Sequence, residues 1–274
     1  MKNQNDLLEE IKAFTPKTGE MAFWWLGQMG FAMKIAGKFL LVDAFLSPHK
    51  NRRIPPAFDV NAPELADYVL GTHDHIDHID RKAWVFIANA SAKTKFVVPM
   101  IHRESVIQEL NVEPERVIGI DENISYTDGD LTIKAIPSAH EFLDTDPVTG
   151  LHPHLGYIIE AEGLRLYHSG DSCIYEGMQD KLRAYRHFDV MFVPINGRDG
   201  VRYRRNTIGN MTTQEAVDLV GVIRPELAVP GHYEMFEGNP GDPGLFLDYL
   251  DAKYPGVCTW IGDHGIRVDV QKKA

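Results

Sequence analysis

The sequence predicts a single α/β domain that spans all 274 residues. Apolar segments of strand length alternate with segments of helical periodicity in both halves of the chain. No linker rich in proline or serine separates two similar halves, and no low-complexity segment interrupts them. A composition that is 44% hydrophobic and 24% charged is typical of a globular protein. It excludes disorder, collagen and coiled coil as the main state of the chain.

The first 20 residues are expected to form a short helical extension. Leu7, Leu8, Ile11 and Phe14 recur at helical spacing. This segment lacks the apolar run of a signal peptide, and no apolar stretch approaches the roughly 20 residues that cross a bilayer. The chain has two cysteines, which excludes a disulfide scaffold. We therefore expect a soluble protein of the cytoplasm.

The remaining elements follow from apolar runs and turn residues. Strands joined by hairpin turns are expected in residues 21–45, where Gly37 separates two apolar runs. Further strands are expected at residues 66–70, 95–99, 116–120, 131–136, 156–161, 164–168, 189–195, 227–229 and 266–270. Helices are expected at residues 82–90, 102–110, 176–186, after a capping box at residues 212–215, and once more before the last strand. Turn or loop structure is expected at residues 127–130, 141–154 and 196–210.

The segment HDHIDH, residues 73–78, places three imidazoles and two carboxylates between a strand and a helix. In an extended chain His73 and His75 point to the same side, so both can reach one ion. Where the chain turns helical, Asp77 and His78 project differently and can serve a second ion. Imidazole with carboxylate suits zinc, iron or manganese. The alternative is a solvated polar turn that caps the helix, which so dense a cluster disfavours.

Three more polar residues, His140, Asp171 and His232, each follow an apolar strand. A small residue comes before each of them and lets the backbone approach a crowded centre. Taken singly, each of the three is more typical of a loop. Their recurrence at successive strand ends indicates one shared site. Asp43, also at a strand end, is expected to hydrogen-bond a ligating imidazole from behind.

HDHIDH resembles the HxHxDH motif of the metallo-β-lactamase superfamily, and the three later residues match that superfamily's remaining ligands in order. The resemblance implies a four-layer αββα sandwich with the site at one edge, between the two sheets. It also implies two groups of metal ligands and one bridge: His73, His75 and His140 for a first ion, Asp77, His78 and His232 for a second, and Asp171 between them.

Several blocks also look like the L-ascorbate-6-phosphate lactonase family. They are WLGQMGF (residues 25–31) with LVD (41–43), THDHIDH (72–78), HLGYIIE (154–160), SGDS (169–172) and NTIGNMTTQEA (206–216). This resemblance implies hydrolysis of a phosphorylated sugar-acid lactone, with manganese as the metal. Zinc is a common occupant in the wider superfamily. An oxygen and nitrogen donor set also admits iron, and one or two ions are compatible with it.

Two divalent ions about 3.5–4 Å apart would lower the pKa of a shared water and polarise the bond under attack. The nucleophile would then be a metal-bound hydroxide. Asp77 and Asp171 are the expected catalytic residues, because they could orient that hydroxide or take its proton. One alternative is a phosphodiesterase or nuclease on the same fold. A metal-binding protein without turnover is the alternative of another class.

A basic loop suggests what the substrate carries. Residues 196–210 hold four arginines against one acid in a chain of net charge −11. Arginine binds phosphate oxygens bidentately, so we expect a phosphate clamp near the metals. A solvated loop paired with surface acids is the alternative. The expected substrate-binding residues are Arg198, Arg202, Arg204, Arg205, Asn206 and His154.

The expected partner is therefore a small anionic substrate that carries phosphate. The acidic balance of the chain disfavours nucleic acid, because negative charge repels the phosphate backbone. No segment announces an apolar membrane face. The family resemblance permits a homo-oligomer.

Overall fold

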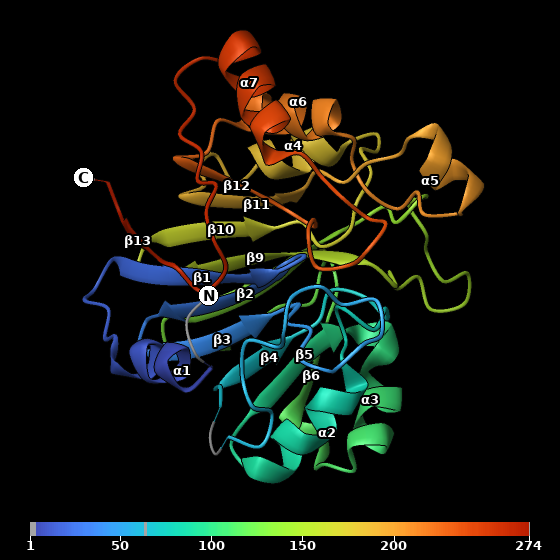
Figure 1. The fold of residues 1–274 in the computed structure, drawn as a ribbon. Coiled ribbons are helices and arrows are strands. Elements are labelled where there is room, and N and C mark those ends of the chain that lie inside the picture. The colour runs from blue at the N-terminus through green and yellow to red at the C-terminus, as the bar shows by residue number, and fades with distance from the viewer. Residues whose placement is uncertain (1–3, 63–64, 274) are drawn as a thin grey trace.

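The computed structural model describes residues 4–62 and 65–273, so residues 1–3 of the predicted N-terminal extension lie outside the described part. Two β-sheets lie face to face, and helices cover the outer face of each (Figure 1). This is the four-layer αββα arrangement that the family resemblance implies. Each sheet has one apolar face toward the other sheet and one toward its helices, which is why the layers form.

The first sheet has seven strands in the order β13-β1-β2-β3-β4-β5-β6. Its strands are β1 (Glu20–Gly27), β2 (Gly30–Ile35), β3 (Lys38–Val42), β4 (Tyr68–Leu70), β5 (Lys95–Pro99), β6 (Val117–Ile120) and β13 (Arg267–Gln271). Pairing is antiparallel from β13 to β3 and parallel from β3 to β6. On its outer side lie α1 (Gln4–Ala13), α2 (Arg81–Ala90) and α3 (Arg103–Leu110).

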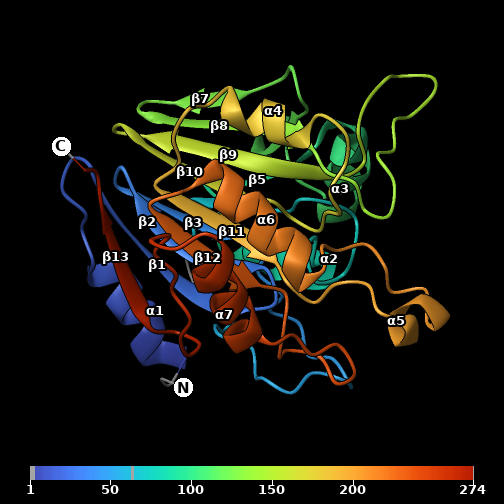
Figure 2. The ribbon, with the colours of Figure 1, turned by 90° about the horizontal axis from the view of Figure 1, so that it is seen from above.

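The second sheet has six strands in the order β12-β11-β10-β9-β8-β7. Its strands are β7 (Tyr126–Asp128), β8 (Leu131–Pro137), β9 (Leu155–Ala161), β10 (Leu164–His168), β11 (Val190–Pro194) and β12 (Leu227–Gly231). The helices α4 (Met178–Arg183), α6 (Thr213–Ile223) and α7 (Pro243–Lys253) cover its outer face. A short helix, α5 (Gly200–Arg204), projects away from the layers (Figure 2).

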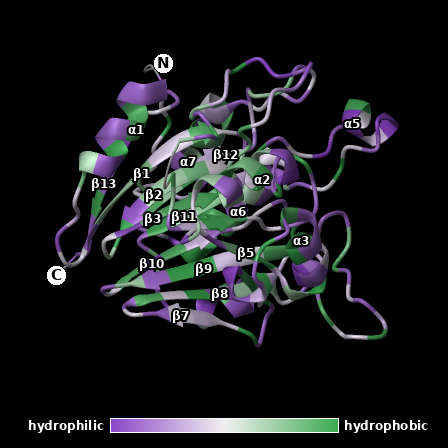
Figure 3. Cartoon of the chain, turned by 90° about the horizontal axis from the view of Figure 1, so that it is seen from below, coloured by the Kyte–Doolittle hydropathy of each residue, from purple (hydrophilic) through white to green (hydrophobic). Residues whose placement is uncertain are grey.

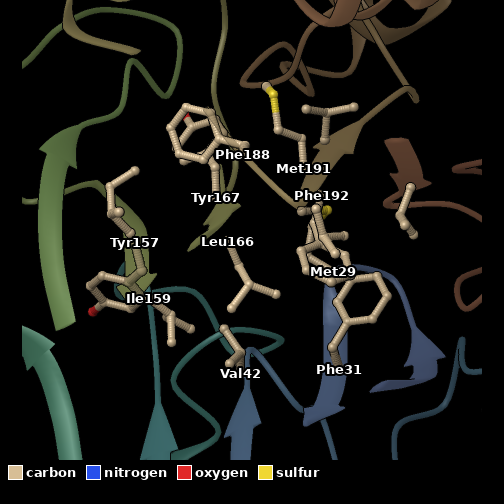
Figure 4. Close-up of a cluster of buried hydrophobic side chains, with 14 of the residues drawn as sticks. Met29, Phe31, Val42, Tyr157, Ile159, Leu166, Tyr167, Phe188, Met191 and Phe192 are labelled. Carbon is tan, nitrogen blue, oxygen red and sulfur yellow. The ribbon is translucent and has the colours of Figure 1, made fainter. Parts of the chain in front are cut away.

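The main core fills the space between the sheets. Figure 4 shows Phe31 and Val42 of the first sheet facing Leu166 and Phe192 of the second. All four side chains are fully buried. Hydrophobic segments gather in the central strands, whereas the helices carry hydrophilic residues as well (Figure 3). Burial at about 25 cal/mol per Å² of apolar surface is the main term that holds the two sheets together.

Several strands end at one edge of the sandwich. In the second sheet β8, β10 and β12 run in the same direction, and in the first sheet β3 runs parallel to β4. The residues directly after these strands therefore meet at that edge. They include every candidate ligand that the sequence predicts, since parallel strands place their carboxyl ends together.

The structure corrects the sequence interpretation in four places. Residues 127–130 are not all turn, because β7 pairs with β8 as far as Asp128 and the turn begins at Gly129. The helix predicted at 176–186 is shorter, because Gly177 adopts φ +88° just before α4. The loop 196–210 contains α5, which begins at an Asp199 cap. The C-terminal end of the chain also contributes a strand to the first sheet, since β13 pairs with β1.

Candidate functional site

The HDHIDH segment lies between β4 and α2 and is folded into tight turns. The backbone N–H groups of His78 and Ile79 both donate to the carbonyl of His75, at 3.0 and 2.8 Å. Asp80 then caps α2 by accepting from the backbone N of Ala83 at 3.2 Å. The same carboxylate accepts from the backbone N of Ser47 at 2.7 Å. These contacts fix the turn and the start of α2, with His73 and His78 buried and His75 exposed.

The predicted ligands come together in two groups of three, and a third group, His73, His78 and Asp171, overlaps with both of them. In each group the candidate ligand atoms all lie within 4.8 Å of one another. The first group is His73, His75 and His140, and the second is Asp77, His78 and His232. These are the two sets that the family resemblance implies.

Asp171 lies between the two groups. Its Oδ1 is 3.3 Å from Nε2 of His78, and its Oδ2 is 3.1 Å from Nε2 of His232 and 3.8 Å from Nε2 of His140. Burial opposes ionisation of Asp171, but the nearby His232 and His78 outweigh it and hold the pKa of its carboxyl well below the usual range. The Asp171 side chain is therefore an anion between the two groups of imidazoles.

The chemistry of these residues fits divalent cations. Nε2 of His78, Nε2 of His232 and Oδ1 of Asp171 are buried and have no hydrogen-bond partner among the described residues. Such orphaned atoms are rare unless water or an ion satisfies them. Burial also lowers the pKa of His73 and His140, which favours the neutral, ligating form of both rings.

Asp43 lies behind the second group, where the sequence prediction puts a supporting carboxylate. Its Oδ2 accepts from Nδ1 of His78 at 2.7 Å and from Oγ1 of Thr72 at 2.7 Å. Its Oδ1 accepts from the backbone N of Thr72 at 2.8 Å. Because a carboxylate only accepts, Nδ1 of His78 carries a proton, so Nε2 is the nitrogen that faces the centre of the site and would bind an ion there.

Two glycines allow the backbone to approach this centre. A Cβ on Gly170, whose φ is +58°, would lie 2.8 Å from the carbonyl oxygen of Leu155 and from Oγ1 of Thr72. A Cβ on Gly209 would lie 2.3 Å from the His140 ring. Any larger residue at these positions would displace the strand end or the ring.

Sequence reasoning missed two buried amides beside the ligands. Nδ2 of Asn210 donates to Oδ2 of Asp171 at 3.1 Å, and Nε2 of Gln28 lies 3.3 Å from Nδ1 of His232. Both side chains are buried. Each lies in a block that resembles the lactonase family, but an asparagine or a glutamine by itself does not indicate a functional role. Only the fold brings Gln28 next to a residue 204 positions away.

A cavity of about 330 Å³ opens over the ligands. It is walled by the candidate ligands, by amide side chains and by the segment from Asn206 to Asn210. No lysine or arginine is among its lining residues in the described part of the chain. Apart from the candidate ligands and His49, the lining side chains are neutral, with amides beside the apolar Ile76, Ile208 and Phe236. Such a lining suits a ligand that offers hydroxyl and carbonyl groups together with carbon surface.

Of the residues that the sequence assigns to substrate binding, some line the pocket and others do not. Asn206 lines the pocket, but the four arginines do not. Arg198 forms an ion pair with Glu215, and Arg202 forms one with Asp199. This differs from a clamp of four, because two of the arginines already have acidic partners and Arg202 also donates to the side chain of Asn239 and the carbonyl of Pro240. Arg204 and Arg205 are exposed, and neither guanidinium has an ion pair among the described residues.

His154 packs against the first ligand group and is not among the residues that line the pocket. Its ring stacks on that of His140, with centroids 5.2 Å apart, and lies 5.4 Å from that of His73. Burial, helped by the neighbouring His140, lowers the pKa of His154 to about 4. His154 is therefore a neutral ring that supports two candidate ligands from behind.

Comparison with known proteins agrees with this architecture. A family model described as a beta-lactamase superfamily domain matches residues 38–233. A protein of Caldivirga maquilingensis named as a metal-dependent hydrolase is 28% identical over 241 residues, covering 86% of this chain and 92% of that protein. In the part of the chain that the structure describes, no helix is both long enough and apolar enough to span a membrane.

Two solved structures share the fold. A metallo hydrolase from Ignicoccus hospitalis has a TM-score of 0.69 at 21% identity, covering 93% of this chain and all of that one (100%). A diiron beta-hydroxylase from Streptomyces venezuelae has a TM-score of 0.68 at 16% identity, covering 94% of this chain and 55% of that one. With residues 38–233 matched by the family model, the chain belongs to the beta-lactamase superfamily domain family and is a metal-dependent hydrolase with the metallo-β-lactamase fold.

Proposed function

We propose that this hydrolase opens a phosphorylated sugar-acid lactone, as the L-ascorbate-6-phosphate lactonases that it resembles do. Manganese or zinc is the proposed metal, with one or two ions bound, and the cytoplasm is the proposed location. The proposed partner is a small anionic substrate, and binding of nucleic acid is not part of the proposal.

One observation carries the proposal. Asp171 lies between two groups of three candidate ligands, and five of these seven residues line a pocket whose wall holds several amides. Divalent ions held there would lower the pKa of a water molecule and polarise a carbonyl group. The neutral amide wall suits the hydroxyl groups of a sugar acid, since each amide both donates and accepts a hydrogen bond.

The side chains have separate tasks in this proposal. Asp77 is part of the second ligand group and only partly buried, so its second oxygen can accept a proton from water. Asp171 stays ionised between the groups, and Asn210 fixes its orientation through the contact to Oδ2. These positions place a proton acceptor beside the floor of the pocket before substrate arrives.

Arg205 is the residue proposed to bind the phosphate. Its Nη1 lies 3.3 Å from the position that a Cβ on Gly238 would occupy, so it reaches the loop that supplies Phe236 and Asn239 to the pocket wall. The next residue, Asn206, lines the pocket itself. A substrate with its lactone on the ligands and its phosphate at the rim would therefore meet an unpaired guanidinium.

Ring opening of L-ascorbate 6-phosphate by manganese-loaded protein tests the function, followed by loss of the absorbance of the enediol lactone. We expect turnover that chelation abolishes and that Asp77→Asn reduces by about a hundredfold or more. Metal content is measured for both proteins. A metal-loaded protein that leaves this lactone intact would contradict the proposal. Hydrolysis of a phosphodiester would then favour the nuclease-type alternative. If neither substrate is hydrolysed, a metal-binding protein without turnover would be favoured.

Arg205→Ala tests the phosphate end. We expect KM to rise at least about tenfold for the phosphorylated lactone and to change little for its dephosphorylated analogue. Arg186→Ala, an exposed arginine after α4, is the matched control. Equal effects of Arg205→Ala on both substrates would show that Arg205 does not bind phosphate.

A further inference from the structure

Two segments project from the same side of the molecule (Figures 2 and 3), and each adjoins a residue that lines the pocket. One is the acidic loop, residues 141–150, which directly follows His140. The other is the basic arm, residues 198–206, which contains α5 and ends at Asn206. His140 and Asn206 both line the pocket, so the bases of both projections border it.

Both projections expose large apolar side chains. On the basic arm Val201 is 47% and Tyr203 59% exposed, and no residue of α5 is buried. On the acidic loop Phe142 is 69% and Val148 90% exposed. Single exposed apolar residues are normal, but a group of them on two neighbouring projections is typical of a surface that another molecule covers.

The projections are nevertheless ordered by their own hydrogen bonds. Asp199 caps α5 by accepting from the backbone N of Val201 and of Arg202, both at 2.8 Å. Asp146 accepts from the backbone N of Val148 at 3.1 Å and from that of Thr149 at 2.7 Å. A helix of five residues is too short to be stable by itself. Segments that hold their shape before contact lose little entropy when they bind.

The charges of the two projections are opposite. The acidic loop carries Glu141, Asp144 and Asp146 and no basic residue. On the basic arm Arg198 and Arg202 are paired with acids, whereas Arg204 is exposed and has no ion pair among the described residues. Arg204 and Val201 are three positions apart on α5, so they share one face of the helix.

We propose that the basic arm of one copy of this chain docks on the acidic loop of a second copy, forming a two-fold symmetric dimer. Val201 and Tyr203 pack on Phe142 and Val148, and Arg204 pairs with Asp144. Each copy carries both projections, so a two-fold axis forms the contact twice. The contact surrounds the mouths of both pockets. Arg204, which the sequence assigns to substrate, then acts between subunits, and Arg205 remains at the rim.

Sedimentation velocity of the full chain over a dilution series tests the proposal. We expect a dimer in the unaltered chain, and we expect Arg204→Glu and Asp144→Arg each to weaken association about tenfold or more, because each creates two like-charge contacts per dimer. Mixing the two variants should restore the dimer, since arm and loop are again opposite in charge at both contacts. Arg186→Glu, far from both projections along the chain, is the control that should not change association.

Three results would overturn the proposal. They are a monomer at every concentration, a dimer that survives both charge reversals, and two monomeric variants that do not combine when mixed. Thermal unfolding shows whether each variant is folded. If Arg204→Glu does not fold, Val148→Asp at the exposed loop tip provides a second variant with the same expected loss of association.

Discussion

At the scale of single residues, the site depends on side chains that hold the candidate ligands. His78 is buried and can present Nε2 to the centre only if its other nitrogen has a partner. Asp43 is that partner, at 2.7 Å, and its backbone adopts φ +46° to reach the ring. This conformation is unfavourable for a non-glycine residue, and its three hydrogen bonds to Thr72 and His78 stabilise it.

Asp43→Asn tests this supporting role. The amide can still accept from Nδ1 of His78 but carries no charge, and its NH₂ group must face the donors of Thr72. We expect affinity for manganese or zinc to fall about 10–100-fold, measured by competition with a chromogenic chelator. Asp67→Asn is a matched control, because Asp67 also accepts a backbone N–H, that of Phe39, at 2.7 Å. An unchanged affinity in Asp43→Asn would show that the carboxylate does not support the ligand.

At the scale of elements, α6 begins where the sequence predicts, and the capping box is confirmed. Thr212 accepts from the backbone N of Glu215 at 3.2 Å, and the Glu215 carboxylate accepts from the backbone N of Thr212 at 2.8 Å. Met211, just before the cap, donates its backbone N–H to the carbonyl of Ser172 at 2.8 Å. The start of α6 thus ties Asn210 to the strand end that carries Asp171.

Thr212→Ala should lower the free energy of unfolding by about 1 kcal/mol, because the N–H of Glu215 loses its partner. Urea unfolding monitored by circular dichroism measures the change. Thr212→Ser keeps the hydroxyl and should retain most of the stability. A loss of equal size in both variants would mean that the methyl group, rather than the cap, carries the effect.

At the scale of the whole molecule, the C-terminal segment closes the fold by returning to the first strand. β13 pairs with β1 from Glu20 to Trp24. Just before β13, the ring of His264 stacks on that of Trp25, with centroids 4.0 Å apart. Burial, only partly offset by Asp263, lowers the pKa of His264 to about 4. The folded chain therefore holds this imidazole neutral.

This histidine makes stability depend on pH. In the unfolded chain His264 takes up a proton near pH 6.5, whereas in the folded chain it does so only near pH 4. The free energy of unfolding therefore falls as the pH is lowered from 6.5 to 4. His264→Phe keeps an aromatic ring and does not titrate. Between pH 7 and pH 5, we expect the free energy of unfolding of His264→Phe to fall by roughly 1 kcal/mol less than that of the unaltered chain. Urea unfolding of chelator-treated protein measures both changes. His187→Phe, exposed in the second half, is the control. Parallel losses in all three proteins would contradict this account.

The sequence by itself determined most of the layers and the candidate ligands. Apolar runs and turn residues mark nearly every strand, because strands that are buried on both faces of a sheet are continuous in apolar residues. HDHIDH is readable because all its ligands lie within six residues. The later ligands are readable because each follows a strand, and strand ends that run in one direction must share an edge.

Tertiary structure decided what depends on residues far apart in the chain. It placed β13 beside β1, Gln28 beside His232 and Asn210 beside Asp171, pairings that leave no local pattern in the sequence. It also separated four neighbouring arginines into two that pair with acids and two that face solvent. A run of charged residues in the sequence shows only which charges are close to each other along the chain. Which of them meet an acid, a substrate or another subunit depends on where the fold directs each side chain.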